Sequence, residues 1–111
     1  MQRIRIKYRK GPEIKFISHL NLMKVLERTI RRADIRVAYT QGFNPHMRIS
    51  YGPALKVGKT SNSEFADIYI DDDTKVSIIM EKLNKVLPLG IEILEAKVID
   101  LKAPSIPSSL T

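Results

Sequence analysis

Two histidines and a serine are the side chains of this sequence best suited to proton transfer. Ser18 and His19 open a predicted helix, where free backbone N–H groups attract anions. His46 lies in a later turn, and Lys15 precedes Ser18 closely. Two histidines and a lysine can serve as general acid, general base and charge stabiliser. One hypothesis is therefore a metal-independent endoribonuclease that uses His19 and His46.

The same residues also have a purely structural interpretation. Ser18 is a good N-cap for the predicted helix, and His19 can pack or hydrogen-bond locally. No carboxylate is obviously placed to orient either imidazole ring. We therefore expect a binding domain rather than an enzyme, and we assign no catalytic residue.

Positive charge is concentrated in the first third of the chain. Residues 1–36 contain eleven lysines and arginines against three carboxylates, while the whole chain of 111 residues has a formal net charge of +7. A one-sided basic surface is typical of proteins that bind polyanions such as RNA. The alternative is a solvated surface that only promotes solubility.

The basic residues follow the periods of a strand and a helix. Cations alternate with apolar residues over residues 3–9, which predicts a strand with one cationic face. Cations next to aromatic rings are typical of surfaces that bind single-stranded RNA. The predicted RNA contacts are Arg3, Arg5, Lys7, Arg9, Phe65 and Tyr69 on the sheet and Lys24, Arg28, Arg31 and Arg32 on the first helix. Alternatively, Asp67 and Asp71 pair with the arginines across strands.

Hydrophobic periodicity predicts an α+β fold with the order β-α-β-β-α-β. Strands are expected at residues 3–9, 47–51, 65–71 and 91–99, helices at 18–33 and 74–87, and a polar loop at 58–63. This order predicts a ferredoxin-like antiparallel sheet with its first and third strands central and two helices on one face. We expect one domain over residues 1–100 and a Pro/Ser-rich tail or linker over residues 101–111.

Several classes of function lack the residues that they need. The sequence contains no cysteine, which excludes disulfides, cysteine-based zinc sites and thiolate-held iron–sulfur clusters. Two histidines are too few for a metal site without carboxylates, so we predict no metal and no cofactor. No apolar run approaches the roughly 20 residues of a membrane helix, and the N-terminus does not resemble a signal peptide. We expect a cytoplasmic protein that does not bind membranes.

Three separated motifs resemble a known family. They are Phe16-Ile17-Ser18-His19-Leu20-Asn21-Leu22-Met23, Glu27-Arg28 with Arg31-Arg32-Ala33, and Gly42-Phe43-Asn44-Pro45-His46. Together they resemble the N-terminal half of the radical-SAM-linked domain family of unknown function. Its members follow, or are fused to, a B12-binding radical S-adenosylmethionine protein. The resemblance implies a radical-SAM partner and a missing C-terminal half, and it assigns no role to Ser18, His19 or residues 42–46.

Together, these features predict an accessory domain that binds RNA through its basic sheet face and first helix and presents it to a radical-SAM partner. A second hypothesis comes from a different class. In it, the basic face is a protein-interaction surface that docks an acidic partner or the domain's own missing C-terminal half.

Overall fold

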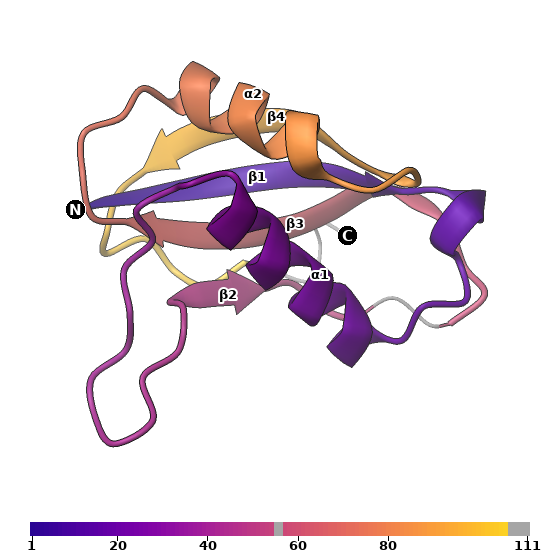
Figure 1. Cartoon of the computed structure of the whole chain (residues 1–111), viewed down its shortest axis with the longest axis horizontal. Coiled ribbons are helices and arrows are strands. Elements are labelled where there is room, and N and C mark those ends of the chain that lie inside the picture. Colours follow the sequence, from indigo (N-terminus) through magenta and orange to yellow (C-terminus); the bar gives the residue numbers. More distant parts are fainter. Residues whose placement is uncertain (55–56, 107–111) are drawn as a thin grey trace.

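Four antiparallel strands form a sheet with two helices on one face in the computed structural model, which describes residues 1–54 and 57–106 (Figure 1). The elements in chain order are β1 (Gln2–Lys10), the 3-10 turn η1 (Pro12–Ile14), α1 (His19–Arg32), β2 (Ile49–Tyr51), β3 (Ser61–Ile70), α2 (Val76–Val86) and β4 (Ile91–Ile99). The strand order is β2-β3-β1-β4, so β1 and β3 are central. The predicted ferredoxin-like fold is confirmed.

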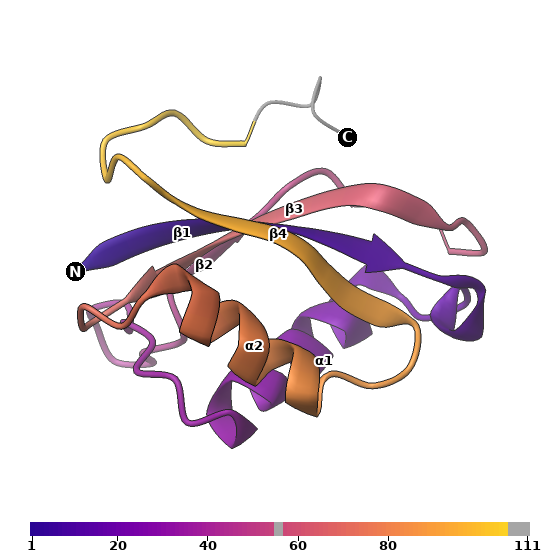
Figure 2. The same ribbon diagram turned by 90° about the horizontal axis from the view of Figure 1, so that it is seen from above.

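The two faces of the sheet have different covers. Figure 2 shows α1 and α2 on one side of the sheet and the segment that follows β4 on the other. Alternation in β1 points Ile4 and Ile6 toward the helices, where both are fully buried. Their partners on β3 are Ile68 and Ala66. The core therefore lies between the sheet and the helices, and the cations at odd positions of β1 lie on the opposite face.

Helix α1 begins and ends with recognised capping motifs. Ser18 is the N-cap, as predicted, because its side chain accepts a hydrogen bond from the Asn21 N–H at 3.1 Å. At the other end, the Ile35 N–H donates to the Ile30 carbonyl at 3.3 Å, and Asp34 has a left-handed φ of 57°. This is a Schellman ending in which Asp34 stands where glycine is usual. Between the caps, Leu22, Leu26 and Ile30 form the buried stripe.

Two strands start at least two residues away from the predicted position. β3 begins at Ser61 rather than at residue 65, because its polar start pairs with the end of β1 through Lys10↔Ser61 and Tyr8↔Glu64. Residues 61–63 of the loop predicted at 58–63 therefore belong to β3, and residues 58–60 precede it. β2 is shorter than predicted and starts at Ile49, since Met47 forms an isolated bridge with Tyr39 instead.

A two-stranded arm, residues 37–48, projects from the body between α1 and β2 (Figure 1). A bridge from Val37 to Ile70 joins its base to β3. The Arg48 N–H donates to the Ala38 carbonyl at 2.7 Å, and the Thr40 N–H donates to the His46 carbonyl at 2.8 Å. The tip contains the motif of residues 42–46, so the predicted turn is part of a hydrogen-bonded structure.

Candidate nucleic-acid interface

The open face of the sheet carries a closed cluster of ion pairs around Asp67, which is 0% exposed. Its Oδ2 accepts from Nε and Nη2 of Arg3 at 2.9 and 2.7 Å. Arg5 donates from Nε to Oδ1 at 2.8 Å and from Nη2 to Oδ2 at 3.0 Å. The predicted alternative of cross-strand pairing is confirmed for Asp67. Asp71 is exposed and makes no ion pair within the described residues.

The segment after β4 completes this cluster from above the sheet. Arg3 donates from Nη1 to the carbonyls of Leu101 and Ala103, and from Nη2 to the Pro104 carbonyl at 3.0 Å. Hydrogen bonding to Asp67 raises the pKa of Arg5, against the opposing effect of partial burial. The guanidinium of Arg3 is thus occupied by internal acceptors, which leaves it no free donor pair for a phosphate.

The aromatic rings on this face are also partly engaged. Tyr69 is 7% exposed, with the guanidinium carbon of Arg48 4.1 Å from its ring centroid and that of Arg3 at 5.6 Å. Phe65 is half-buried and lines a hollow of about 490 Å³ together with Lys7. Tyr69 cannot offer a free face for base stacking, whereas Phe65 and Lys7 remain accessible at the hollow.

The remaining cation of β1, Arg9, is loosely paired. Its Nη2 lies 3.9 Å from Oε1 of Glu13, and both side chains are about one-third exposed. An exposed pair of this kind contributes little to stability. On the open face of the sheet, the cations of β1 thus range from the enclosed Arg3 to the partly exposed Arg9, whereas Lys10 is buried on the other face.

Helix α1, by contrast, presents its cations to solvent. The four predicted contacts on this helix are all exposed, and none forms an ion pair within the described part of the chain: Lys24, Arg28, Arg31 and Arg32. Arg28 and Arg32 are four residues apart, so they lie on the same side of the helix. They line a groove of about 180 Å³ between α1 and the end of α2. Arg31 lines a second hollow of about 390 Å³ with Tyr39 of the arm.

The two histidines are not brought together. His19 packs edge-on against Tyr51, with ring centroids 5.7 Å apart and an interplanar angle of 81°. His46 is part of the arm, where its backbone N–H donates to Oγ1 of Thr40 at 3.1 Å. Figures 1 and 2 place the N-terminal end of α1 and the arm toward opposite ends of the molecule. His19 therefore has the local packing role of the non-catalytic interpretation, whereas His46 contributes a hydrogen bond of its backbone and exposes its side chain.

Beneath the N-terminal end of α1 lies a buried polar group that sequence reasoning missed. Lys10 is 1% exposed, and its Nζ donates to the Ile17 carbonyl at 3.3 Å. Burial raises the pKa of Tyr8, with a smaller contribution from the charge of Glu64. Burial also raises the pKa of Tyr51, whose hydroxyl has no hydrogen-bond partner in the described structure. The inward alternation of β1 continues from Ile4 to Lys10, and this signal could have revealed the buried lysine.

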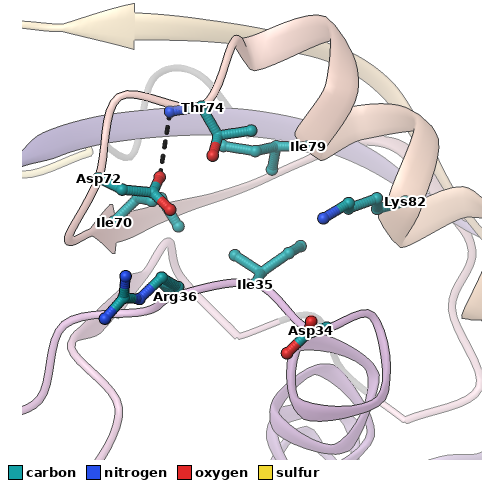
Figure 3. A pocket seen from close by; sticks show the side chains of 8 residues that line it. All are labelled: Asp34, Ile35, Arg36, Ile70, Asp72, Thr74, Ile79 and Lys82. Atoms are coloured by element: carbon teal, nitrogen blue, oxygen red, sulfur yellow. Dashed lines mark hydrogen bonds between the residues drawn. The ribbon is translucent and has the colours of Figure 1, made fainter.

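A charged cleft of about 350 Å³ separates the segment after α1 from the start of α2 (Figure 3). Asp34 and Arg36 lie on one wall, and Asp72 and Lys82 on the other. The Asp72 carboxylate accepts from the Thr74 N–H at 3.0 Å, which lowers the pKa of Asp72, as do the charges of Arg36 and Lys82. Two carboxylates offset two cations, so the cleft has no net attraction for a polyanion.

The described residues meet neither the requirements of a three-ligand metal site nor those of a membrane-spanning helix. Within residues 1–54 and 57–106, no group of three His, Asp, Glu or Cys side chains is close enough to hold a metal ion. None of the described helices has both the length and the apolar character needed to cross a bilayer. The exposed cations of α1, together with the neighbouring arm, are thus the best-formed candidate for a functional surface.

Comparison with known proteins identifies the family but assigns no activity. No curated protein matches the chain. A family model described as an uncharacterised protein conserved in bacteria, DUF2344, matches residues 3–111 and therefore nearly the whole chain. The protein belongs to this family.

Proposed function

We propose that this domain binds RNA through the exposed cationic face of α1. The observation that carries the proposal is the difference between its two basic surfaces. Arg3 and Arg5 are neutralised by Asp67, while Arg28 and Arg32 are exposed without a carboxylate partner in the described structure. Only cations that still lack internal partners can bind phosphates and release their counterions.

The spacing of the α1 cations supports this assignment. Lys24, Arg28 and Arg32 occupy successive turns, and at 1.5 Å per residue they extend over about 12 Å. Phosphates follow one another at about 3.4 Å per strand in a duplex, so this length covers several phosphates. Arg31 and Arg32 lie in the last turn of α1, where the negative end of the helix dipole stabilises their charged form.

We further propose that the domain acts in the cytoplasm as an accessory to a radical-SAM protein. This part rests on the resemblance of the three motifs at residues 16–23, 27–33 and 42–46, and on the absence of cysteine, since the cluster would be held by the partner. Co-purification of the two proteins from their natural host would support it. The proposal would be contradicted if no radical-SAM protein co-purifies with this chain or with the RNA that the chain binds.

The test measures the affinity for a single-stranded 12-nucleotide RNA across a salt series by fluorescence anisotropy. In the double variant Arg28→Glu/Arg32→Glu we expect at least a tenfold weaker affinity. The salt slope should decrease in magnitude by about 1.4, at about 0.7 for each phosphate that the protein no longer neutralises. Equal unfolding free energies would show that the fold is intact.

A matched control places the same charge change on the other face. Lys97 and Lys102 are exposed on the sheet side, so Lys97→Glu/Lys102→Glu changes the net charge identically. This variant should keep the wild-type salt slope. If both double variants lose affinity equally, only the overall charge matters and α1 is not the interface. A wild-type affinity that does not respond to salt would refute RNA binding altogether.

The open sheet face favours a second candidate function, the docking of an acidic protein or of a C-terminal half such as the resemblance implies. The hollow beside Phe65 is partly apolar and is also lined by Lys7 and Lys97. Hydrogen exchange of β4 amides should slow when such a partner is present. Unchanged exchange in the presence of an acidic partner protein would count against this surface.

A further inference from the structure

The tip of the arm carries Phe43, an aromatic side chain that is fully exposed. A single exposed apolar side chain is common on a protein surface, so its neighbours decide whether it marks a site. A fully exposed phenyl ring does gain free energy when a ligand buries it. The hydrogen bonds of Thr40 and Arg48 described above hold both sides of the arm. The arm therefore presents the ring at a fixed place before any ligand binds.

The tip itself is built to hold this shape. Gly42 has a φ of 118°, a conformation that other residues adopt only with strain. Pro45 fixes its own φ and restricts Asn44 to extended conformations. A stiff turn loses little conformational entropy when its side chain meets a partner.

The charge of the arm indicates what kind of partner fits. Residues 35–48 contain Arg36, Arg48 and His46 and not a single carboxylate. Arg36 and Arg48 lie at the base of the arm, where Arg48 stacks on Tyr69 and Arg36 lines the hollow beside α1, so the positive charge lies below the ring and not around it. A segment with an exposed aromatic tip and a cationic base suits a ligand with flat faces and negative charge, which is the chemistry of single-stranded nucleic acid. A purely apolar protein pocket would not require the arginines.

The arm is also placed to share a ligand with α1. Tyr39 and Met47 of the arm line the hollow of about 390 Å³ that also contains Arg31 of α1. Asp34 and Asp71 balance Arg31 and Arg36 in this hollow, so it joins the arm to the helix without itself attracting phosphate. An RNA strand whose phosphates lie along α1 thus passes the base of the arm at the C-terminal end of the helix. A nucleotide of this strand that is not base-paired can turn toward the tip.

We infer that Phe43 stacks on an unpaired base of the RNA whose phosphates bind α1. This inference rests on the proposed function and adds to it a preference for single-stranded or looped RNA. Stacking on an aromatic side chain contributes between about fivefold and a hundredfold in affinity per base, and it does not depend on salt. The cations and the ring therefore make separable contributions.

The experiment compares wild type, Phe43→Leu and Arg28→Glu/Arg32→Glu on two ligands. One is a single-stranded RNA of 12 nucleotides that contains 2-aminopurine, and the other is an abasic strand of equal length. We expect Phe43→Leu to weaken binding of the first ligand between about fivefold and a hundredfold, with an unchanged salt slope. Binding of the abasic strand should stay the same. The quenching of 2-aminopurine that stacking causes in the wild type should disappear.

The matched control is Phe16→Leu, because Phe16 is another largely exposed phenylalanine that lies outside the arm, just before α1. It should leave both affinities unchanged. If Phe43→Leu binds both strands like the wild type while the α1 variant still loses salt dependence, the inference fails and the proposed function stands. An equal loss on both strands would also overturn it, since Phe43 would then act on the backbone. If no form of the protein binds either strand, both proposals fail.

Discussion

The sheet and the first helix present similar rows of cations and use them in opposite ways. Arg3 and Arg5 of β1 lie against Asp67 of β3, and the segment after β4 adds carbonyl acceptors above Arg3. Arg28 and Arg32 of α1 are exposed and without ion pairs in the described chain. One row stabilises the fold, and the other remains available to a ligand.

The difference arises from where each row finds its neighbours. A strand residue is paired with a residue far away in sequence, as Arg5 is with Asp67. The exposed side of a helix meets residues three or four positions away, and around Arg28 the charged ones are the cations Lys24, Arg31 and Arg32. Glu27 is the one carboxylate of the helix, and it forms no ion pair within the described residues. Regular spacing of cations in the sequence therefore indicates that they share one face of a strand or helix. In a sheet, the register between strands decides whether carboxylates of the neighbouring strand neutralise that face.

Removal of the shared carboxylate should give the largest effect. Asp67→Asn keeps the shape of the side chain but leaves two arginines beside an uncharged group, so we expect a loss of about 3–5 kcal/mol of unfolding free energy. Urea denaturation measures it. Asp73→Asn, at an exposed carboxylate, is the control and should change stability by less than about 0.5 kcal/mol. A loss below about 1 kcal/mol for Asp67→Asn would contradict the ion cluster.

The same substitution made once in each row of cations should give the next largest effect. Arg5→Gln removes hydrogen bonds to a charged, buried acceptor and should cost about 2–3 kcal/mol with an unchanged salt slope for RNA. Arg32→Gln should leave stability within about 0.5 kcal/mol and reduce the slope by about 0.7. Denaturation and binding measured on the same preparations test both. A reversed pattern would exchange the assigned roles of sheet and helix.

On the open face of the sheet, both carboxylate oxygens of Asp67 accept hydrogen bonds. On the helix-covered face, by contrast, the buried hydroxyl of Tyr51 lacks a hydrogen-bond partner in the described structure. Burial raises the folded-state pKa of Tyr8 and Tyr51 above about 10, the ordinary value in an unfolded chain. Stability is thus fully present below about pH 10 and falls above it, by about 1.4 kcal/mol per pH unit for each tyrosine.

Tyr51→Phe should halve this alkaline loss and should not destabilise the protein at pH 7, with a gain of up to about 1 kcal/mol. Urea titrations between pH 8 and 11 measure both effects. Tyr39→Phe, at an exposed tyrosine, is the control and should keep the wild-type pH dependence. A clear loss of stability in Tyr51→Phe at pH 7 would reveal a partner for the hydroxyl.

The smallest predicted effect concerns the end of α1. Asp34 adopts a φ of 57°, so Asp34→Gly should stabilise the protein by about 0.5–1 kcal/mol. It also removes a carboxylate near Arg31 and should raise the affinity for RNA about twofold. Asp34→Asn should give the gain in affinity with little gain in stability. Equal affinities in all three proteins would place the RNA away from this end of the helix.

The fold could be predicted from the sequence because its signals are local. Alternation in β1 and the stripe of Leu22, Leu26 and Ile30 in α1 define which faces are buried. The start of β3 at Ser61 was missed because polar residues there gain strand structure only by pairing with the end of β1. The local periodicity of a sequence does not predict pairing between residues that are far apart in the chain.

The candidate site was predicted less completely for the same reason. The cations of α1 were identified, and so was the motif at residues 42–46. Whether Arg3 was free or paired depended on the position of Asp67 and of carbonyls near residue 103. That the motif lies on a projecting arm depended on the bridge from Val37 to Ile70.

The central position of β1 also has a consequence for how the protein folds. Arg3 has Tyr69 as its neighbour on one side and Ile99 on the other, so β1 completes its pairing only after β4 has been synthesised. Pairings of such wide sequence separation slow folding to the range of milliseconds to seconds. Until β4 arrives, one hydrogen-bonding edge of β1 is open to wrong partners. The sheet therefore cannot be completed before residue 99 has been synthesised.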